Sequence, residues 1–211
     1  MKLIYFILFL LIPFSGQAGN DEYRRNMLRA KAMIDTATME QTLIVAANYF
    51  ERIAAMNPGE WLPCYYAAYC YARVSHLHEA TGKRDTWVDK AQLQIDKAFS
   101  SVPENPEVLV MKGFVLQARM DINPMARGLK YYAETMACFD RAIKLCPENP
   151  RGYLWKGINL FNTPARFGGG RDKGCKLIKI AIEKFKAFNP RDSLMPDWGY
   201  EYALEMIEKC K

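Results

Sequence analysis

Six cysteines carry the most reactive side chains of this 211-residue chain. An even number of cysteines is typical of disulfide-bonded proteins in an oxidising compartment. Two pairs cannot bond, because each lies on one expected helix with its members about 9 Å or about 12 Å apart along the axis, whereas a disulfide spans at most about 7 Å between Cα atoms. The excluded pairs are Cys64 with Cys70 and Cys138 with Cys146. The two remaining cysteines are Cys175 and Cys210.

Cys175 and Cys210 can form a disulfide if the last two helices pack together, and other pairings stay open. The alternative is that all six cysteines are small buried core residues.

No catalytic motif accompanies these cysteines. His76 and His78 are the only histidines and stand two residues apart, so they point to different faces of one helix. The sequence contains no Gly-x-Ser-x-Gly, His-Glu-x-x-His or phosphate-loop pattern, and nothing marks one cysteine as an activated thiolate. We therefore predict a protein that is not an enzyme and that has no cofactor and no metal site.

A glycine-rich segment before an expected helix is a candidate anion-binding loop. Its residues are Gly168, Gly169, Gly170 and Arg171. Backbone N–H groups at a helix start, together with a guanidinium, can hold an anion. The competing interpretation is a tight turn in which glycine supplies backbone angles that other residues resist.

Short proline-containing breaks recur along the chain and divide it into similar segments. The anchors Pro58, Pro103, Pro147 and Pro190 are spaced by 45, 44 and 43 residues. Each break stops a helix, because proline lacks an N–H group and clashes with the preceding turn. Apolar and small residues keep the same offsets from these anchors: ten residues after stand Ala68, Gly113 and Gly157; three further stand Tyr71, Leu116 and Leu160; eight before stand Phe50, Ile95, Phe139 and Ile182; five before stand Ile53, Ala98, Ala142 and Phe185.

This order of small, large apolar, aromatic or aliphatic, alanine and proline positions resembles the tetratricopeptide repeat (TPR) signature. The resemblance covers about residues 21–190 and implies an all-α, right-handed α-α superhelix of helical hairpins. The chain departs from the family in its period, near 44 residues instead of about 34. We expect the extra residues to lie between the two helices of each hairpin, at about 76–86, 120–128 and 162–171.

Two further features qualify the resemblance. Lys112 and Lys156 stand where the family usually has leucine. The segment 162–170 is similar to the long inter-helix loops of exported bacterial repeat proteins, including a type associated with solute transport.

We predict one domain, residues 19–211, with about four helical hairpins and a C-terminal capping helix. The expected repeats cover about 21–58, 59–103, 104–147 and 148–190, and the cap covers 194–211. The expected helices run near 21–36, 39–56, 60–78, 85–101, 106–120, 128–145, 150–162, 171–187 and 196–210.

The first 18 residues have the pattern of a secretory signal. Lys2 precedes an apolar run over residues 3–14, and Gly16 and Ala18 stand at the small-residue positions of a cleavage site. Twelve helical residues span only about 18 Å, which is too short for a hydrocarbon core of about 30 Å. We predict cleavage after Ala18, a periplasmic or secreted protein, and no stable membrane insertion afterwards.

The charge of the chain does not favour nucleic acid as a partner. The formal net charge is +6, and the basic residues are interspersed along the expected helices. A nucleic-acid-binding protein concentrates them on one face or stripe.

The resemblance places a candidate binding groove on the first helix of each hairpin, which lines the concave face in the TPR family. The groove residues are Tyr65, Tyr69, Arg73, Val110, Phe114, Gln117, Leu154, Ile158 and Phe161. Most are aromatic or aliphatic, whereas a free-standing peptide clamp is usually polar there. Either other segments cover this face, or it is an apolar channel for a peptide, a lipid-like molecule or another small ligand.

From these features we predict a non-catalytic scaffold that binds a protein or peptide in the cell envelope. The alternative is a ligand-binding component associated with solute transport, which holds a small apolar molecule in the concave groove.

Overall fold

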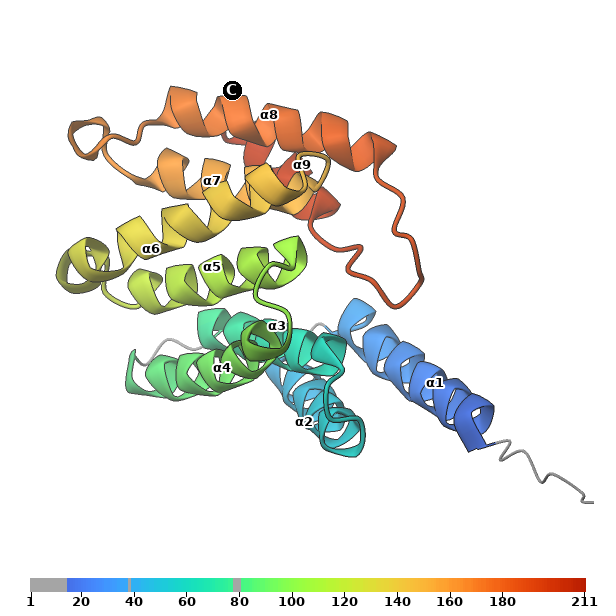
Figure 1. Cartoon of the computed structure of the whole chain (residues 1–211). Helices are drawn as coiled ribbons and strands as arrows, with labels where there is room; N and C mark the ends of the chain where they lie inside the picture. Colours follow the sequence, from blue (N-terminus) through green and yellow to red (C-terminus); the bar gives the residue numbers. More distant parts are fainter. Residues whose placement is uncertain (1–14, 38, 78–80) are drawn as a thin grey trace, which may run out of the picture.

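The structure is a computed structural model that describes residues 15–37, 39–77 and 81–211. Within these ranges all regular secondary structure is helical (Figure 1). In chain order the helices are α1 (Ser15–Asp35), α2 (Glu40–Met56), α3 (Trp61–Leu77), α4 (Thr81–Ser101), α5 (Pro106–Asp121), α6 (Pro124–Leu145), α7 (Pro150–Asn162), the 3₁₀ turn η1 (Ala165–Phe167), α8 (Arg171–Ala187) and α9 (Tyr200–Glu208).

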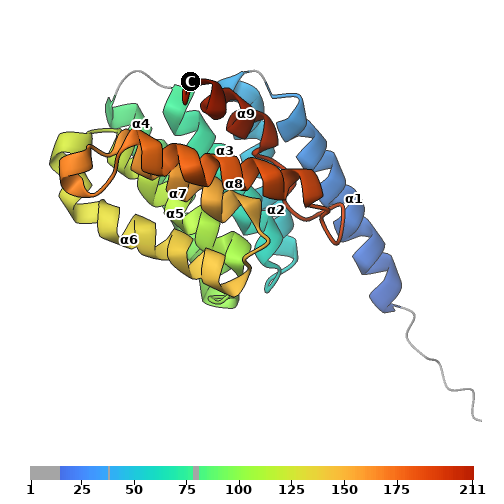
Figure 2. The same ribbon diagram turned by 90° about the horizontal axis from the view of Figure 1, so that it is seen from above.

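Consecutive helices pack as antiparallel hairpins that stack on one another, as Figures 1 and 2 show from two directions. The pairs are α1 with α2, α3 with α4, α5 with α6, and α7 with α8, and α9 follows as a final helix. This arrangement confirms the predicted all-α, TPR-like solenoid.

The Asn-Pro dipeptides start helices by a common mechanism. At α5 the Asn105 side chain accepts a hydrogen bond of 2.9 Å from the backbone N–H of Glu107, and at α7 Asn149 accepts one of 3.0 Å from that of Arg151. Proline occupies the first helical turn in both, where its missing N–H has no intrahelical partner to lose.

The predicted inter-helix insertions were wrong in two of three hairpins. Helix α4 begins at Thr81 instead of residue 85, and α6 begins at Pro124 instead of residue 128. The Asn123 side chain accepts a hydrogen bond of 3.1 Å from the N–H of Ala126, so the Asn-Pro pair starts α6 four residues earlier than expected. The extra residues therefore lengthen second helices, and only the third insertion, which contains η1, is a connection.

Small residues at the mid-helix anchors let the two helices of a hairpin approach closely. A Cβ atom on Gly113 would overlap the Phe139 ring of α6. A Cβ atom on Gly157 would lie 3.0 Å from the carbonyl oxygen of Gly174 in α8. Both contacts confirm the repeat register that the sequence indicated.

The residues between α8 and α9, 188–199, form an extended segment that we name the C-terminal strap. It leaves α8, passes close to α1 and returns to α9 (Figure 1). Arg24 of α1 forms an ion pair of 2.7 Å with Asp192, and the Lys31 ammonium donates to the carbonyls of Ser193 and Met195 at 2.8 and 3.0 Å. The strap thus connects the last hairpin to the first.

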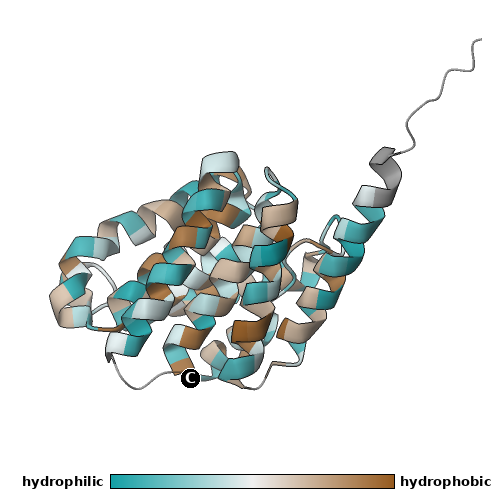
Figure 3. Cartoon of the chain, turned by 90° about the horizontal axis from the view of Figure 1, so that it is seen from below, coloured by the Kyte–Doolittle hydropathy of each residue, from teal (hydrophilic) through white to brown (hydrophobic). Residues whose placement is uncertain are grey.

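Helix α1 makes this connection mainly through polar side chains. Most of its length is hydrophilic in Figure 3, and Met27, Ala30 and Ile34 are its buried apolar residues. The capping helix was predicted over 196–210, but α9 covers only Tyr200–Glu208 because the residues before it contact α1 and α3 as a strap.

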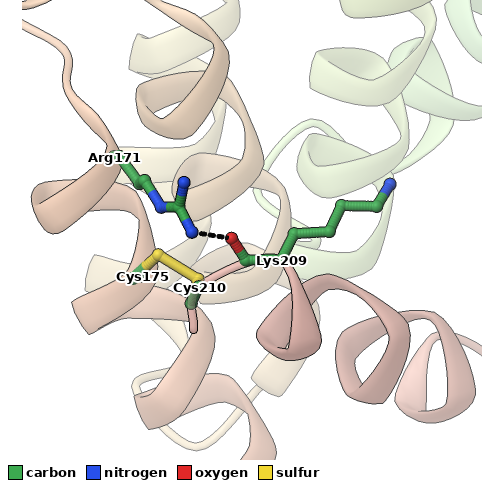
Figure 4. Close-up of a disulfide and its surroundings, with 4 residues drawn as sticks. All are labelled: Arg171, Cys175, Lys209 and Cys210. Atoms are coloured by element: carbon green, nitrogen blue, oxygen red, sulfur yellow. Dashed lines mark hydrogen bonds between the residues drawn. A yellow bond between two sulfur atoms is a disulfide. The ribbon is translucent and has the colours of Figure 1, made fainter.

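A disulfide between Cys175 of α8 and Cys210 fixes the C-terminal end of the chain on the last hairpin (Figure 4). This confirms the pairing that packing of the last two helices would allow. Cys64, Cys70 and Cys138 are buried free thiols and Cys146 is a half-buried one.

The predicted signal sequence falls mostly outside the described residues. Helix α1 begins at Ser15, so the expected cleavage after Ala18 lies in its first turn, and cleavage stays a prediction. In the described part of the chain, no helix combines the length and apolar character needed to cross a membrane.

Candidate functional site

Three of the predicted groove residues, Tyr65, Tyr69 and Phe114, contact Trp198 of the strap. Most of the predicted groove residues are buried, and Arg73 and Phe161 are half-buried. Phe161 stands apart from the rest, because it packs beside Gly174 of α8 and under the Arg171 guanidinium. The buried members are Tyr65, Tyr69, Val110, Phe114, Gln117, Leu154 and Ile158.

Hydrogen bonds hold the strap on the inner face of α3. The Trp198 indole N–H donates to the Tyr65 hydroxyl at 3.0 Å, and the Tyr66 hydroxyl donates to the Leu194 carbonyl at 2.8 Å. Burial raises the pKa of both tyrosines far above the usual range, so both hydroxyls keep their protons. The concave face is therefore covered by the protein's own C-terminal residues.

A buried ion pair between Arg151 and Glu107 contacts the strap. The Arg151 side chain is 0% exposed and that of Glu107 is 8% exposed, and Arg151 Nε donates to Glu107 Oε2 at 2.9 Å. Asn149 donates to the same carboxylate at 2.9 Å, and Arg151 reaches the Trp198 carbonyl at 3.3 Å. Buried charges are tolerated when they are paired in this way, so the pair joins α5, α7 and the strap.

Beside this network, aromatic rings from five parts of the chain meet in one group. We name it the aromatic cluster; its members are Tyr69 and His76 of α3, Phe114 of α5, Trp155 of α7, Trp198 of the strap and Tyr202 of α9. Tyr69 stacks on Trp198 with 4.5 Å between ring centroids, and Phe114 lies 4.4 Å from Trp155. Tyr202 stacks on Trp155 at 5.6 Å.

The aromatic cluster opens to solvent on one side. Tyr202 is 38% exposed, and His76 is also exposed. Three half-buried charged residues surround this opening: the Arg73 guanidinium lies 5.5 Å from the centre of the Tyr69 ring, Arg84 donates to the Ser75 carbonyl at 3.0 Å, and Asp121 ends α5. Burial raises the pKa of Asp121 to about 6, against the opposing charge of Arg84.

Two polar atoms in this region have no hydrogen-bond partner among the described residues. They are the indole Nε1 of Trp155 and the Oδ1 of Asn159, both buried and one turn apart on α7. The Asn159 amide donates to Gln117 Oε1 at 2.7 Å, so its nitrogen is satisfied while its oxygen is not. Buried polar atoms are nearly always paired in folded proteins, and these two leave a donor and an acceptor beside the rings.

The glycine-rich loop has the geometry of a turn. Gly168 and Gly170 have φ values of +89° and +122°, which favour glycine. Their N–H groups donate to the carbonyls of Ala165 and Leu160 at 3.0 and 2.9 Å. The Arg171 guanidinium donates to the Lys209 carbonyl (Figure 4). Anion binding at Gly168, Gly169, Gly170 and Arg171 stays a prediction.

The buried free thiols are poor nucleophiles in this environment. Burial raises the pKa of Cys70 to about 12 and that of Cys138 to about 11, so both remain protonated at neutral pH. In the residues that the structure describes, no group of three or more histidine, cysteine or acidic side chains is placed to hold a metal ion.

Of the six residues of the aromatic cluster, the sequence predicted Tyr69 and Phe114 as groove residues and did not predict Trp155, Trp198 or Tyr202. Trp198 and Tyr202 follow the last repeat, where no periodic pattern indicates which way a side chain points. Trp155 stands between two predicted groove positions of α7, and no signal in the sequence distinguished it from a residue of the hairpin interior.

The fold and site define a TPR-like helical solenoid whose inner face is covered and aromatic. No protein-family model matches this chain, and neither does any curated protein. Among solved structures it is similar to the HusA haemophore from Porphyromonas gingivalis, with a TM-score of 0.80, 28% identity, and coverage of 90% of this chain and 92% of that one. A thermophilic TPR protein from Thermus thermophilus, TTC0263, matches with a TM-score of 0.52 at 14% identity, over 89% of this chain and 93% of that one, and this match bears on the fold alone.

Proposed function

We propose that this protein is a non-catalytic carrier that binds haem, or a closely related tetrapyrrole, at the aromatic cluster. The observation that supports it most is the aromatic cluster itself, in a chain that resembles a haemophore over nearly all its length. The proposal favours the ligand-binding alternative from the sequence over the scaffold.

The chemistry of the cluster suits a flat, largely apolar ligand. Aromatic side chains bind planar rings by stacking, and a few convergent polar groups set the orientation of the ligand. Tyr202 and His76 offer accessible ring surface, while Arg73 and Arg84 stand at the opening, where they can pair with the carboxylates of haem propionates.

A covered inner face argues against the peptide-clamp form of the scaffold hypothesis. The strap takes the place that an extended peptide would occupy along α3, since it bonds to Tyr65 and Tyr66. A macromolecular partner would therefore have to use an outer surface. Export of the carrier through the predicted signal sequence is consistent with binding a ligand outside the cytoplasm.

Titration with haemin tests the proposal. Protein purified after export should give a saturable change in the haem absorbance spectrum at one equivalent. Tyr202→Ala should weaken binding about 3- to 10-fold, the effect of losing one aromatic stacking partner. Tyr200→Ala is the matched control, because Tyr200 also lies on α9 but packs against Phe185, away from the cluster.

Two results of the haemin titration would contradict the proposal. Absence of saturable binding, or equal weakening by Tyr202→Ala and Tyr200→Ala, would remove the aromatic cluster as the site.

A further inference from the structure

Three described segments lie on one side of the stack, at the same end of the helices, and we name this region the loop end. The loop end consists of the start of α4 (residues 81–88), the start of α6 (residues 124–131), and η1 with the start of α8 (residues 165–173). The start of α6 and the turn η1 lie on the same side of the stack, at one end of the helices, in both Figure 1 and Figure 2. These segments are the longer connections and extensions by which the chain departs from the usual repeat.

Large apolar side chains project from the loop end into solvent. Met125 is 96% exposed and Leu129 is 95% exposed, and they are neighbours because they stand four residues apart on α6. Phe167 of η1 is 61% exposed. Single exposed apolar residues are ordinary, but three such side chains at one end of the molecule indicate an interaction surface.

Basic side chains surround these apolar tips. Lys83, Lys130, Arg166 and Lys173 are all exposed at the loop end. The Arg166 guanidinium lies 5.0 Å from the centre of the Phe167 ring, so a cation and an apolar tip stand in direct contact.

Most of the described acidic side chains at the loop end are either paired with an arginine or half-buried. Asp85 accepts two hydrogen bonds from Arg127, at 2.6 and 2.8 Å. Asp121 is half-buried, and Asp172 is the exposed carboxylate among the described residues of this end. The described residues of the loop end therefore carry a positive charge in sum.

The opposite end of the helices carries exposed acidic residues, two of which are paired: Glu104 with Arg141 and Glu148 with Lys184. Its short turns carry the exposed residues Glu60, Glu104 and Glu148. The basic residues of the loop end would attract an anionic surface.

We propose that the loop end docks on a membrane surface that contains anionic lipid, with Met125, Leu129 and Phe167 inserted at the headgroup level. Apolar side chains ringed by lysine and arginine are the combination that binds such interfaces, through buried apolar area together with electrostatic attraction. The tips are separate points on projecting turns and do not form a flat apolar face, which suits a lipid interface better than a protein surface. The proposal does not depend on haem binding.

Vesicle co-sedimentation tests it. Protein purified after export from cells expressing the full chain is mixed with vesicles of phosphatidylcholine alone, or of phosphatidylcholine with about one third phosphatidylglycerol. We expect binding to the anionic vesicles that weakens with rising salt, since salt screens exposed charges. The double variant Met125→Ser/Leu129→Ser should bind at least about fivefold more weakly, because it removes inserted apolar area.

Matched controls make the result specific. Met56→Ser/Leu93→Ser changes two other exposed apolar residues, which are 68% and 56% exposed and lie on α2 and α4, and it should leave vesicle binding unchanged. Lys130→Gln/Arg166→Gln should reduce binding and its salt dependence. All these sites are exposed, so circular dichroism should show unchanged folding.

The proposal is overturned by equal pelleting with both vesicle types, by no pelleting, or by equal effects of the two serine double variants. Crosslinking of the loop end to a protein, without vesicle binding, would also overturn it and assign the surface to a protein partner. Haemin titration of the same samples reports separately on the proposed function.

Discussion

The indole N–H of Trp198 donates a hydrogen bond of 3.0 Å to the hydroxyl of Tyr65, across a sequence separation of 133 residues. This bond joins the strap to the first helix of the second hairpin. It shows that the inner face of the solenoid is closed by the chain itself. Trp198 also stacks on Tyr69, with 4.5 Å between the ring centroids. The same side chain therefore covers the inner face and forms part of the aromatic cluster.

Replacing Trp198 should therefore destabilise the whole molecule. Trp198→Ala removes a large ring from the cluster and should lower the free energy of unfolding by about 2–4 kcal/mol. Trp198→Phe keeps a ring but loses the hydrogen bond to Tyr65, and should cost about 1 kcal/mol. Urea unfolding measures both, and equal stability of the two variants and the parent protein would contradict a structural role for the strap.

The buried pair of Arg151 and Glu107 predicts strong coupling between two substitutions. Glu107→Gln leaves a buried guanidinium without its counter-charge and should cost about 3–5 kcal/mol. The double variant Glu107→Leu/Arg151→Met removes both charges and should recover a large part of that loss. A double variant that is less stable than either single one would show that the pair does not act as a unit.

The disulfide predicts a redox-dependent stability. Cys175 and Cys210 close a loop with a sequence separation of 35 residues, so Cys175→Ser/Cys210→Ser should lower the free energy of unfolding by about 3–4 kcal/mol. Reduction of the parent protein by a dithiol should produce the same loss. Cys146→Ser, at a half-buried free thiol, is the control and should have a much smaller effect in thermal unfolding.

The close packing around Gly113 predicts that adding even one methyl group at this position destabilises the protein. Gly113→Ala places a methyl group into the Phe139 ring and should cost about 1–3 kcal/mol by overpacking. Gly128→Ala is the control, because no atom outside its own chain neighbourhood lies within 4 Å of the added Cβ. Thermal unfolding with an unchanged midpoint for Gly113→Ala would refute the close approach of α5 and α6.

The raised pKa of Asp121 predicts that this residue contributes more to stability at mildly acidic pH than at neutral pH. Burial raises its pKa from 3.8 to about 6, so the folded state binds this proton more tightly than the unfolded state does. The contribution of Asp121 to the free energy of unfolding should rise by about 1–2 kcal/mol as the pH falls from about 6 towards 4, because only the folded protein has taken up this proton in that window. His76, whose pKa is lowered to about 4 by desolvation and by Arg84, contributes in the opposite direction over the same range, so the comparison with a variant isolates Asp121. Asp121→Asn should lack this contribution in urea unfolding measured across the same pH range.

Much of the fold could be predicted because its signals are local. A proline stops a helix by the geometry of its own ring, and an asparagine before proline caps the next helix with its own side chain. Pro103 and Pro147 therefore marked hairpin boundaries, and Gly113 and Gly157 marked close approaches that the structure confirms. The starts of α4 and α6 were placed four residues late.

The sequence by itself determined an all-helical repeat protein with apolar first helices, since periodic spacing reports on neighbours a few residues apart. Only the tertiary structure decided what covers those helices. The strap and Tyr202 have no repeat to follow, and their positions depend on partners far away in the chain, such as Arg24 for Asp192 and Tyr65 for Trp198. The candidate site is built from those long-range contacts, and hence Trp198 and Tyr202 could not be found from sequence spacing.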